Sequence, residues 1–182
     1  MYAPDRIDFA ILAALQNDAR LSNKELAARV GLAASSCLER VRRLRAQRVL
    51  TGFRALVDPR ALGIAIQALV FVRLVRHARK QVKAFRQHAL SLAETTALYH
   101  VAGHNDYIVH VAVRDADHLR DLALDAFTSR PEVARIETHL IFEHTAKPQL
   151  PVLADTDSGI KAQRAPRAPP TSQLSRGRAR AR

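Results

Sequence analysis

The stretch GLAASSCLERVRRLR, residues 31–45, combines an apolar helical stripe with a dense cluster of positive charge. Cys37, Val41 and Leu44 recur at helical spacing, which predicts that one side of a helix over residues 34–47 is buried. Four arginines fall within the last six residues of the stretch and lie off this stripe. Two interpretations are open: an ordinary solvated basic helix, or a surface that meets nucleic-acid phosphates.

The residues before this stretch favour the second interpretation. An earlier helix is predicted over residues 5–16, with Asp5 as its cap. Ser22 and Glu25 then stand three residues apart as a capping box for a second helix, and Gly31 can take the left-handed conformation that ends it. A short helix, a glycine turn and a basic helix in this order predict a winged-helix-like helix-turn-helix domain over residues 1–54.

The predicted third helix has polar side chains of two kinds. Small polar and acidic residues near its start suit the edges of bases, and the arginines after them suit guanine or phosphate. The predicted DNA-contacting residues are Ser35, Ser36, Glu39, Arg40, Arg42 and Arg43. Cys37 lies on the apolar stripe and is interpreted as a small core residue.

Composition and charge agree with a DNA partner. The chain has 182 residues, 48% of them apolar, and a formal net charge of +12. Residues 1–54 hold ten basic and five acidic residues, residues 55–147 hold twelve and ten, and residues 148–182 hold seven and two. A nearly balanced centre is thus flanked by two basic ends, which favours a polyanionic partner over general solvation. A single cysteine excludes an internal disulfide framework, and no long apolar segment is present, so we expect a soluble, cytoplasmic, nucleoid-associated protein.

The rest of the chain predicts a second domain, and the protein as a whole is expected to be of the α+β class. Alternating residues 53–57 resemble a strand that leads into a hinge, with the linker placed at residues 55–63. Residues 64–147 follow the order β-α-β-β-α-β, a ferredoxin-like sandwich. Its expected elements are strands at 66–75, 97–102, 107–113 and 134–143, and helices at 79–92 and from 115. Residues 148–182, rich in proline, alanine and arginine, are predicted to form a disordered basic tail that adds nonspecific DNA affinity or only solubility.

Four stretches together resemble one known family: DRIDFAILAALQNDAR, SNKELAARVGLAASSCLERVRRLR, VDPRALG and VAGHNDYIVHV. The chain is similar over residues 5–147 to the leucine-responsive/asparagine-responsive (Lrp/AsnC) family of bacterial transcription factors. The resemblance implies an N-terminal DNA-binding domain and a C-terminal domain that dimerises, assembles further and senses amino acids. It also implies homodimers or larger rings, for which an octamer is one possible size. We expect no cofactor.

Two positions depart from the family pattern. Ala33 replaces a capping serine before the third helix, a change that generally costs about 1 kcal/mol. Arg48 replaces the glycine usual after that helix, so the turn must close differently or hold a strained residue.

The resemblance also implies where an effector binds, at the turn HVAGHNDY between the middle strands. Exposed amides near Gly103 would hold a carboxylate, and Asp106 would receive an α-ammonium group. The full set of predicted effector-binding residues is His100, Gly103, His104, Asn105 and Asp106. The alternative is that these residues only close a hairpin. No metal site is expected, because the histidines of this region show no compact ligand spacing.

Two other functions fit parts of the sequence. Siroheme decarboxylases resemble the same two-domain arrangement, but such an enzyme has no need for arginines on the outer face of its third helix. A stand-alone ligand-binding protein would not require two basic ends. We therefore expect a regulator without catalytic residues, which binds double-stranded DNA and a small effector.

Overall fold

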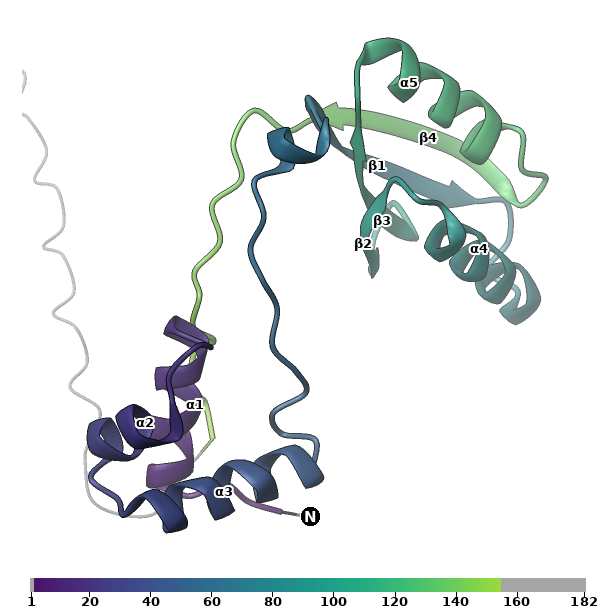
Figure 1. Ribbon diagram of the computed structural model, residues 1–182. Helices are drawn as coiled ribbons and strands as arrows, with labels where there is room; N and C mark the ends of the chain where they lie inside the picture. Colours follow the sequence, from purple (N-terminus) through teal and green to yellow (C-terminus); the bar gives the residue numbers. More distant parts are fainter. Residues whose placement is uncertain (1, 155–182) are drawn as a thin grey trace, which may run out of the picture.

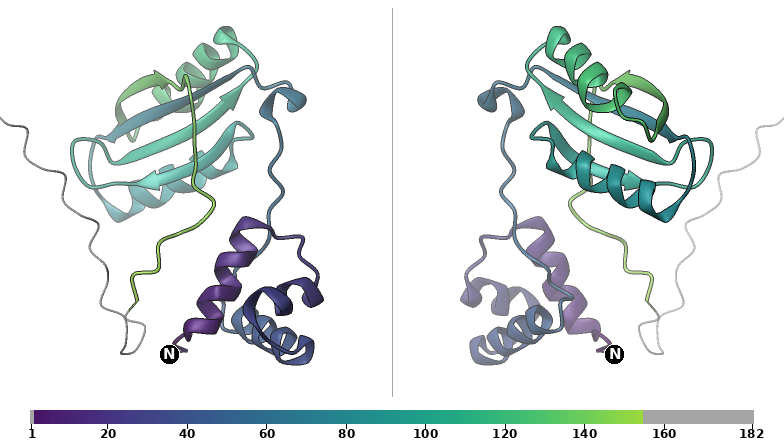
Figure 2. Two further views of the ribbon diagram at one scale, coloured as in Figure 1. Left: turned by 90° about the vertical axis from the view of Figure 1, so that its left-hand side faces the viewer. Right: turned by 90° about the vertical axis from the view of Figure 1, so that its right-hand side faces the viewer.

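The computed structural model describes residues 2–154, which form a helical domain and a sheet domain connected by extended segments (Figure 1). The helical domain comes first in the chain. Two views at right angles to Figure 1 show one extended segment that runs from α3 to β1 and another that returns from β4 toward the helices (Figure 2). The elements are α1 (Arg6–Asn17), α2 (Asn23–Val30), α3 (Ala34–Ala46), a 3₁₀ turn (Pro59–Leu62), β1 (Ile66–Leu74), α4 (Arg79–Ser91), β2 (Thr95–His100), β3 (Tyr107–Val113), α5 (Ala116–Asp121) with a π-helical continuation (Leu122–Thr128), and β4 (Val133–Leu140).

The first two helices begin where their capping residues predict, and the second ends where Gly31 predicts. Asp5 caps α1 in a capping box with Asp8, and Ser22 caps α2 in a second box with Glu25. Gly31 ends α2 in the left-handed conformation, with φ at 69°. These local interactions fix the boundaries because they satisfy backbone groups that have no partner inside the helix.

The helical domain packs around a small apolar core supplied by all three helices. Ile11 and Leu15 come from α1, and Leu26 comes from α2. Cys37 and Leu44 of the predicted stripe are both fully buried, and Val41 packs at the edge of the cluster. Burial raises the pKa of the Cys37 thiol, as befits the core residue that the sequence predicts.

Both departures from the family pattern are visible at the ends of α3. Ala33 occupies the cap position, and no side chain caps the helix there. Arg48 takes the left-handed conformation, with φ at 55°, so the turn after α3 holds a strained residue. For a residue with a Cβ this conformation costs roughly 1–2 kcal/mol.

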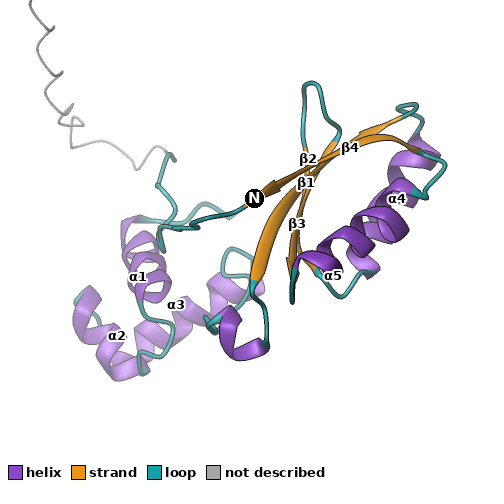
Figure 3. Cartoon of the chain, turned by 90° about the horizontal axis from the view of Figure 1, so that it is seen from above, coloured by secondary structure: helices purple, strands orange, loops and turns teal. Residues whose placement is uncertain are grey.

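The second domain is the predicted ferredoxin-like sandwich. Its antiparallel sheet has the order β2-β3-β1-β4. Strand β1 lies at the centre, with Val70 opposite Val109 of β3 and Thr138 of β4. Helices α4 and α5 cover one face of this sheet, as the view from above shows (Figure 3).

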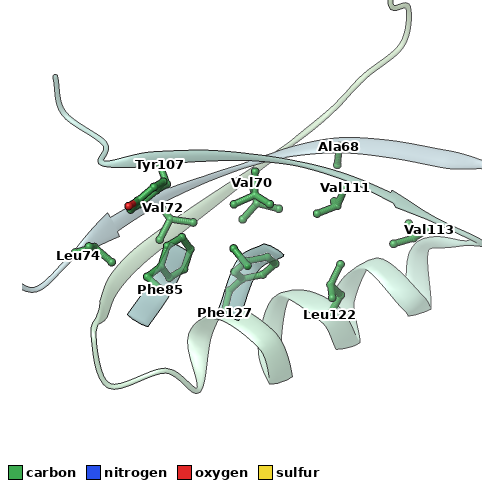
Figure 4. Packing of buried hydrophobic residues seen from close by; sticks show 12 residues of the cluster. Ala68, Val70, Val72, Leu74, Phe85, Tyr107, Val111, Val113, Leu122 and Phe127 are labelled. Carbon is green, nitrogen blue, oxygen red and sulfur yellow. The ribbon is translucent and has the colours of Figure 1, made fainter. Parts of the chain in front are cut away.

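The core of this domain lies between the sheet and the two helices. Alternate residues of β1 and β3 point into it, and they meet Phe85 of α4 and Phe127 from the end of the α5 segment (Figure 4). The Phe85 ring packs against the Tyr107 ring with centroids 5.0 Å apart. The strand residues of this cluster are Ala68, Val70, Val72, Leu74, Tyr107, Val109, Val111 and Val113.

Three parts of the prediction differ from the structure. Residues 53–57 are extended but form no strand, because within residues 2–154 their backbone finds no hydrogen-bonding partner. The last strand ends at Leu140, and Leu140 and Phe142 are exposed although the alternation predicted them on a half-buried strand. The expected tail begins with residues bonded to α1: the Gln149 side chain donates to the Ala13 carbonyl, and the Leu150 amide donates to Gln16. The rest of the predicted disordered tail, from residue 155, lies outside the described residues.

No helix between residues 2 and 154 has the length and apolar character needed to cross a bilayer.

Candidate DNA-binding and effector sites

The exposed side of α3 carries five of the six predicted DNA-contacting residues. Because Cys37 and Leu44 face the core, the opposite side of the helix faces solvent. The exposed predicted residues are Ser35, Ser36, Glu39, Arg42 and Arg43. Arg45, which the prediction omitted, is also exposed, and like Arg42 it forms no ion pair with residues 2–154.

Arg40 is placed differently, because it is bound within its own domain. Its Nη1 lies 2.7 Å from Asp5 Oδ2 and 2.9 Å from Asp8 Oδ1, and its side chain is 23% exposed. Asp8 is a buried carboxylate at the start of α1. This contact between α1 and α3 joins residues more than thirty positions apart, so residue spacing along the sequence could not reveal it.

Arg43 is exposed but also tethered, through Tyr2 in the N-terminal arm. Its Nε donates to the Tyr2 hydroxyl at 3.0 Å, and its guanidinium carbon lies 5.2 Å from the centre of the Tyr2 ring. The Tyr2 hydroxyl in turn donates to Asp8 Oδ2. Sequence reasoning missed Tyr2 and assigned Asp5 only a capping role.

The arginines change the acidity of the carboxyl groups that they contact. The hydrogen bond from Arg40 holds the pKa of Asp5 below its usual value. Burial acts to raise the pKa of Asp8, but hydrogen bonds from Tyr2 and Arg40 outweigh burial and lower it. Burial and the neighbouring Asp8 carboxylate raise the pKa of Tyr2. At neutral pH the cluster therefore holds two carboxylates, two guanidinium groups and a protonated phenol.

Of the predicted effector residues, His100 ends β2 and the other four lie in the turn between β2 and β3. Gly103 has φ at 127°, a conformation that favours glycine, and a Cβ there would meet no atom within 4 Å. The His100 ring stacks on the Tyr107 ring with centroids 4.7 Å apart, while His104 is exposed and Asn105 is half-buried. The turn thus presents open backbone beside polar side chains.

Asp106 is buried beneath this turn and ties it to the end of β1. Its Oδ2 accepts from the Leu74 amide at 2.7 Å, and its Oδ1 lies 2.7 Å from Nδ1 of the exposed His77. The hairpin itself is closed by the backbone, since the Val101 amide donates to the Asp106 carbonyl at 3.0 Å. The Asp106 carboxylate instead fixes the turn against the end of β1. His77 follows β1, and no sequence pattern pointed to it.

Several of the remaining histidines are hydrogen-bonded to a single partner, such as His118 to Glu94. Within residues 2–154, no three His, Cys, Asp or Glu side chains are arranged to hold a metal ion. His110 Nε2 lies 3.0 Å from Gln67 Oε1, and burial, with a contribution from His144, lowers the pKa of His110.

The fold and the exposed face of α3 define a DNA-binding helix-turn-helix domain joined to a ferredoxin-like domain. Residues 5–45 match the AsnC-type helix-turn-helix domain, and residues 67–150 match the Lrp/AsnC ligand binding domain. The chain belongs to the Lrp/AsnC family and is a transcriptional regulator of that type. The resemblance seen in the sequence is confirmed.

Individual relatives agree with this assignment. The HTH-type transcriptional regulator AldR of Mycolicibacterium smegmatis is 41% identical over 140 residues, which cover 77% of this chain and 82% of the relative. The leucine-responsive regulatory protein of Escherichia coli K12 is 37% identical over 139 residues, or 76% of this chain and 85% of the relative. A transcriptional regulator of Neisseria meningitidis, solved as a complex with L-methionine, superposes with a TM-score of 0.77 at 26% identity, covering 83% of this chain and 98% of that one.

The carboxylates of the helical domain predict a loss of stability in acid. A carboxyl group with a lowered pKa binds fewer protons in the folded than in the unfolded state. Its contribution to the free energy of unfolding is therefore complete above the unfolded pKa of about 3.9, and it is lost as the pH falls toward the lower pKa of the folded state. We expect urea unfolding, followed by circular dichroism, to show falling stability below about pH 4. The Asp8→Asn variant should be less stable than the wild type at neutral pH, and it should lose less stability than the wild type on acidification. An equal loss in both proteins would contradict the pairing of Asp8.

Proposed function

We propose that this regulator binds double-stranded DNA with the exposed face of α3, as a homo-oligomer that responds to an amino acid or a related small molecule. This role would place the protein with the nucleoid in the cytoplasm. The observation that carries the DNA-binding proposal is the outward face of α3, where small polar residues precede guanidinium groups free of ion pairs within the described part of the chain.

The two ends of that face have different roles in the proposal. Ser35, Ser36 and Glu39 lie in the first turns of α3, the part of a recognition helix that approaches base edges in the major groove. Arg42 and Arg45 lie further along and suit the phosphate backbone, which is contacted without regard to sequence. An exposed arginine with no carboxylate partner gives up no ion pair when it binds a phosphate.

The oligomer is supported by exposed apolar side chains on the segments that connect the domains. Leu56 is 101% exposed in the first segment, and Phe142 is 97% exposed in the segment after β4. Phe53 and Leu56 also line a cavity of about 630 Å³, together with Leu15 of α1. The backbone of residues 51–57 is unpaired within the described part of the chain, so a strand of a second copy would satisfy it.

The sheet supports the same conclusion. The face turned away from α4 and α5 carries Leu69 and Phe71 of β1 and Ile108 of β3, all only half-buried. The same face also carries polar side chains, among them His110 and Glu137, so its apolar side chains form a patch within a mixed surface. Apolar patches of this kind often mark contacts between protein chains. A second copy of this chain would cover it, which would also bury the exposed side chains of the extended segments.

An effector site at the turn of residues 100–106 is supported by open backbone at Gly103 and by the buried carboxylate of Asp106. The amides would hold the carboxylate of an amino acid, and Asp106 Oδ1 would receive its ammonium group in place of His77. That a structural relative was solved with L-methionine supports this class of ligand. Because Asp106 also accepts a hydrogen bond from the end of β1, a ligand that binds Asp106 would shift the end of that strand.

The enzymatic alternative has less support. The relatives named above are transcriptional regulators, and the arginines of α3 point to DNA rather than to a tetrapyrrole substrate.

Removing one free guanidinium should weaken DNA binding and make it less sensitive to salt. For Arg42→Gln we expect the slope of log K against log salt to fall by about 0.9 per bound subunit, because one phosphate contact fewer releases fewer counterions. Fluorescence anisotropy with a duplex selected from a random pool measures this slope. Lys83→Gln, in the exposed side of α4, serves as the matched control and should leave it unchanged. A normal slope for Arg42→Gln would count against α3 as the DNA-binding face.

Charge placed on the exposed apolar segments should break the oligomer. Leu56→Asp and Phe142→Asp should each weaken self-association by about tenfold or more, the effect of removing a well-buried interface side chain. Sedimentation equilibrium measures the dissociation constant. Leu124→Asp is the control, since Leu124 is 53% exposed on the α5 segment, away from both connecting segments. A monomeric wild-type protein would refute the proposal.

Neutralising Asp106 should abolish effector binding and spare DNA binding. In Asp106→Asn the amide oxygen can still accept from the Leu74 amide, but no charge remains to pair with an ammonium group. Calorimetry against a panel of the standard amino acids measures binding, with Asp125→Asn on the exposed side of the α5 segment as the control. If the wild type binds none of them, or if Asp106→Asn binds normally, the proposed site is wrong.

A further inference from the structure

The cluster of Tyr2, Asp5, Asp8, Arg40 and Arg43 contains charged groups that the proposed function does not use. It lies where the N-terminal arm and the first turn of α1 meet α3, on the domain that binds DNA. Its two carboxylates balance its two guanidinium groups, so the cluster as a whole presents no net charge to a phosphate backbone. Arg40 and Arg43 therefore differ from Arg42 and Arg45 of the same helix, whose charges are not balanced by a carboxylate within the described residues.

Arg40 is the more firmly held of the two. A single nitrogen, Nη1, bridges Asp5 and Asp8 at 2.7 and 2.9 Å. The Asp8 side chain is only 1% exposed, so moving Arg40 to a phosphate would leave a buried carboxylate with much weaker pairing. The loss of a partner by a buried charge is far more costly than a surface ion pair is favourable. Arg40 therefore stays on Asp8 when α3 meets DNA.

Arg43 is held at one edge and free at the other. The Tyr2 hydroxyl occupies its Nε, the Tyr2 ring lies beside the guanidinium, and Asp8 Oδ1 is 3.7 Å from Nη2. Its side chain remains 44% exposed, and Nη1 forms no hydrogen bond within the described chain. A side chain already fixed in this way loses less conformational freedom on binding than a mobile one.

We propose that Arg40 is a positioning residue that locks α3 onto α1 through Asp8, and that Tyr2 is a second positioning residue that presents the free edge of Arg43 to DNA. The inference rests on the proposed DNA-binding role of α3. The arginines of this helix then have three different roles. Arg42 and Arg45 supply charge to the phosphates, Arg43 supplies an oriented donor, and Arg40 makes no contact with DNA.

The test compares the salt dependence of DNA binding with the stability of the domain. Arg40→Gln should lower the urea midpoint and leave the slope of log K against log salt unchanged, whereas Arg42→Gln should lower the slope by about 0.9 per subunit and leave the midpoint unchanged. If Arg40→Gln lowers the slope as Arg42→Gln does, Arg40 contacts DNA and the inference is wrong. If the slope for Arg42→Gln equals that of the wild type, the proposal that DNA binds the exposed face of α3 is wrong instead.

A double variant keeps the test informative if Arg40→Gln does not fold. Asp8→Asn with Arg40→Gln removes the buried carboxylate together with its half-buried partner, and such paired neutralisation is tolerated far better than the loss of one partner. It should recover stability relative to Arg40→Gln and retain the wild-type slope. A slope reduced in this variant would again assign Arg40 to the phosphates.

Tyr2→Phe tests the second half of the inference. It keeps the ring and removes the hydroxyl, so we expect DNA affinity to fall about threefold to tenfold, the effect of having to order one long side chain, with no change in slope. An unchanged affinity would overturn the role of Tyr2. A change in slope would overturn it too, because Tyr2 would then alter the number of phosphate contacts rather than the orientation of Arg43.

Discussion

The buried carboxylate of Asp8 is the interaction on which the DNA-binding domain depends. A helix-turn-helix must hold its recognition helix at a fixed angle, and the apolar core of this domain is small. Asp8 adds a directional contact, since its two oxygens accept from the N-terminal arm and from α3 at once. A buried carboxylate is costly unless it is paired, so the domain is stable chiefly in the arrangement that brings Arg40 to it.

This arrangement also determines how positive charge is distributed over α3. The helix has arginines on two of its sides, but those toward α1 are neutralised by acidic residues and those facing outward are not. Within residues 2–154, unpaired positive charge on the outer face of α3 therefore comes from Arg42 and Arg45. The polar residues proposed to read bases thus lie on a helix that is held to α1 by the ion pair of Arg40 with Asp8.

Much of this organisation could be predicted from sequence because its causes are local. The capping boxes at Asp5 and Ser22 fix two helix starts, and the alternation in β1 and β3 fixes the core side of the sheet. The partners of Arg40 and Asp106 could not be predicted, since each bond joins residues about thirty positions apart whose approach depends on the packed fold. The alternation of residues 134–143 placed Phe142 on the apolar side of a strand, but Phe142 is exposed because the strand ends at Leu140 and no described residue covers it.

The most direct measurement of the central claim is photo-crosslinking from the outer face of α3. The Ser36→Cys variant can be labelled there with a photoreactive maleimide. The native Cys37 is buried and the pKa of its thiol is raised, which disfavours labelling at that residue. Gln87→Cys on the exposed side of α4 is the matched control. The account predicts that light links DNA to position 36 and not to position 87. A protein labelled at position 36 that binds the duplex with normal affinity, yet forms no crosslink, would contradict it.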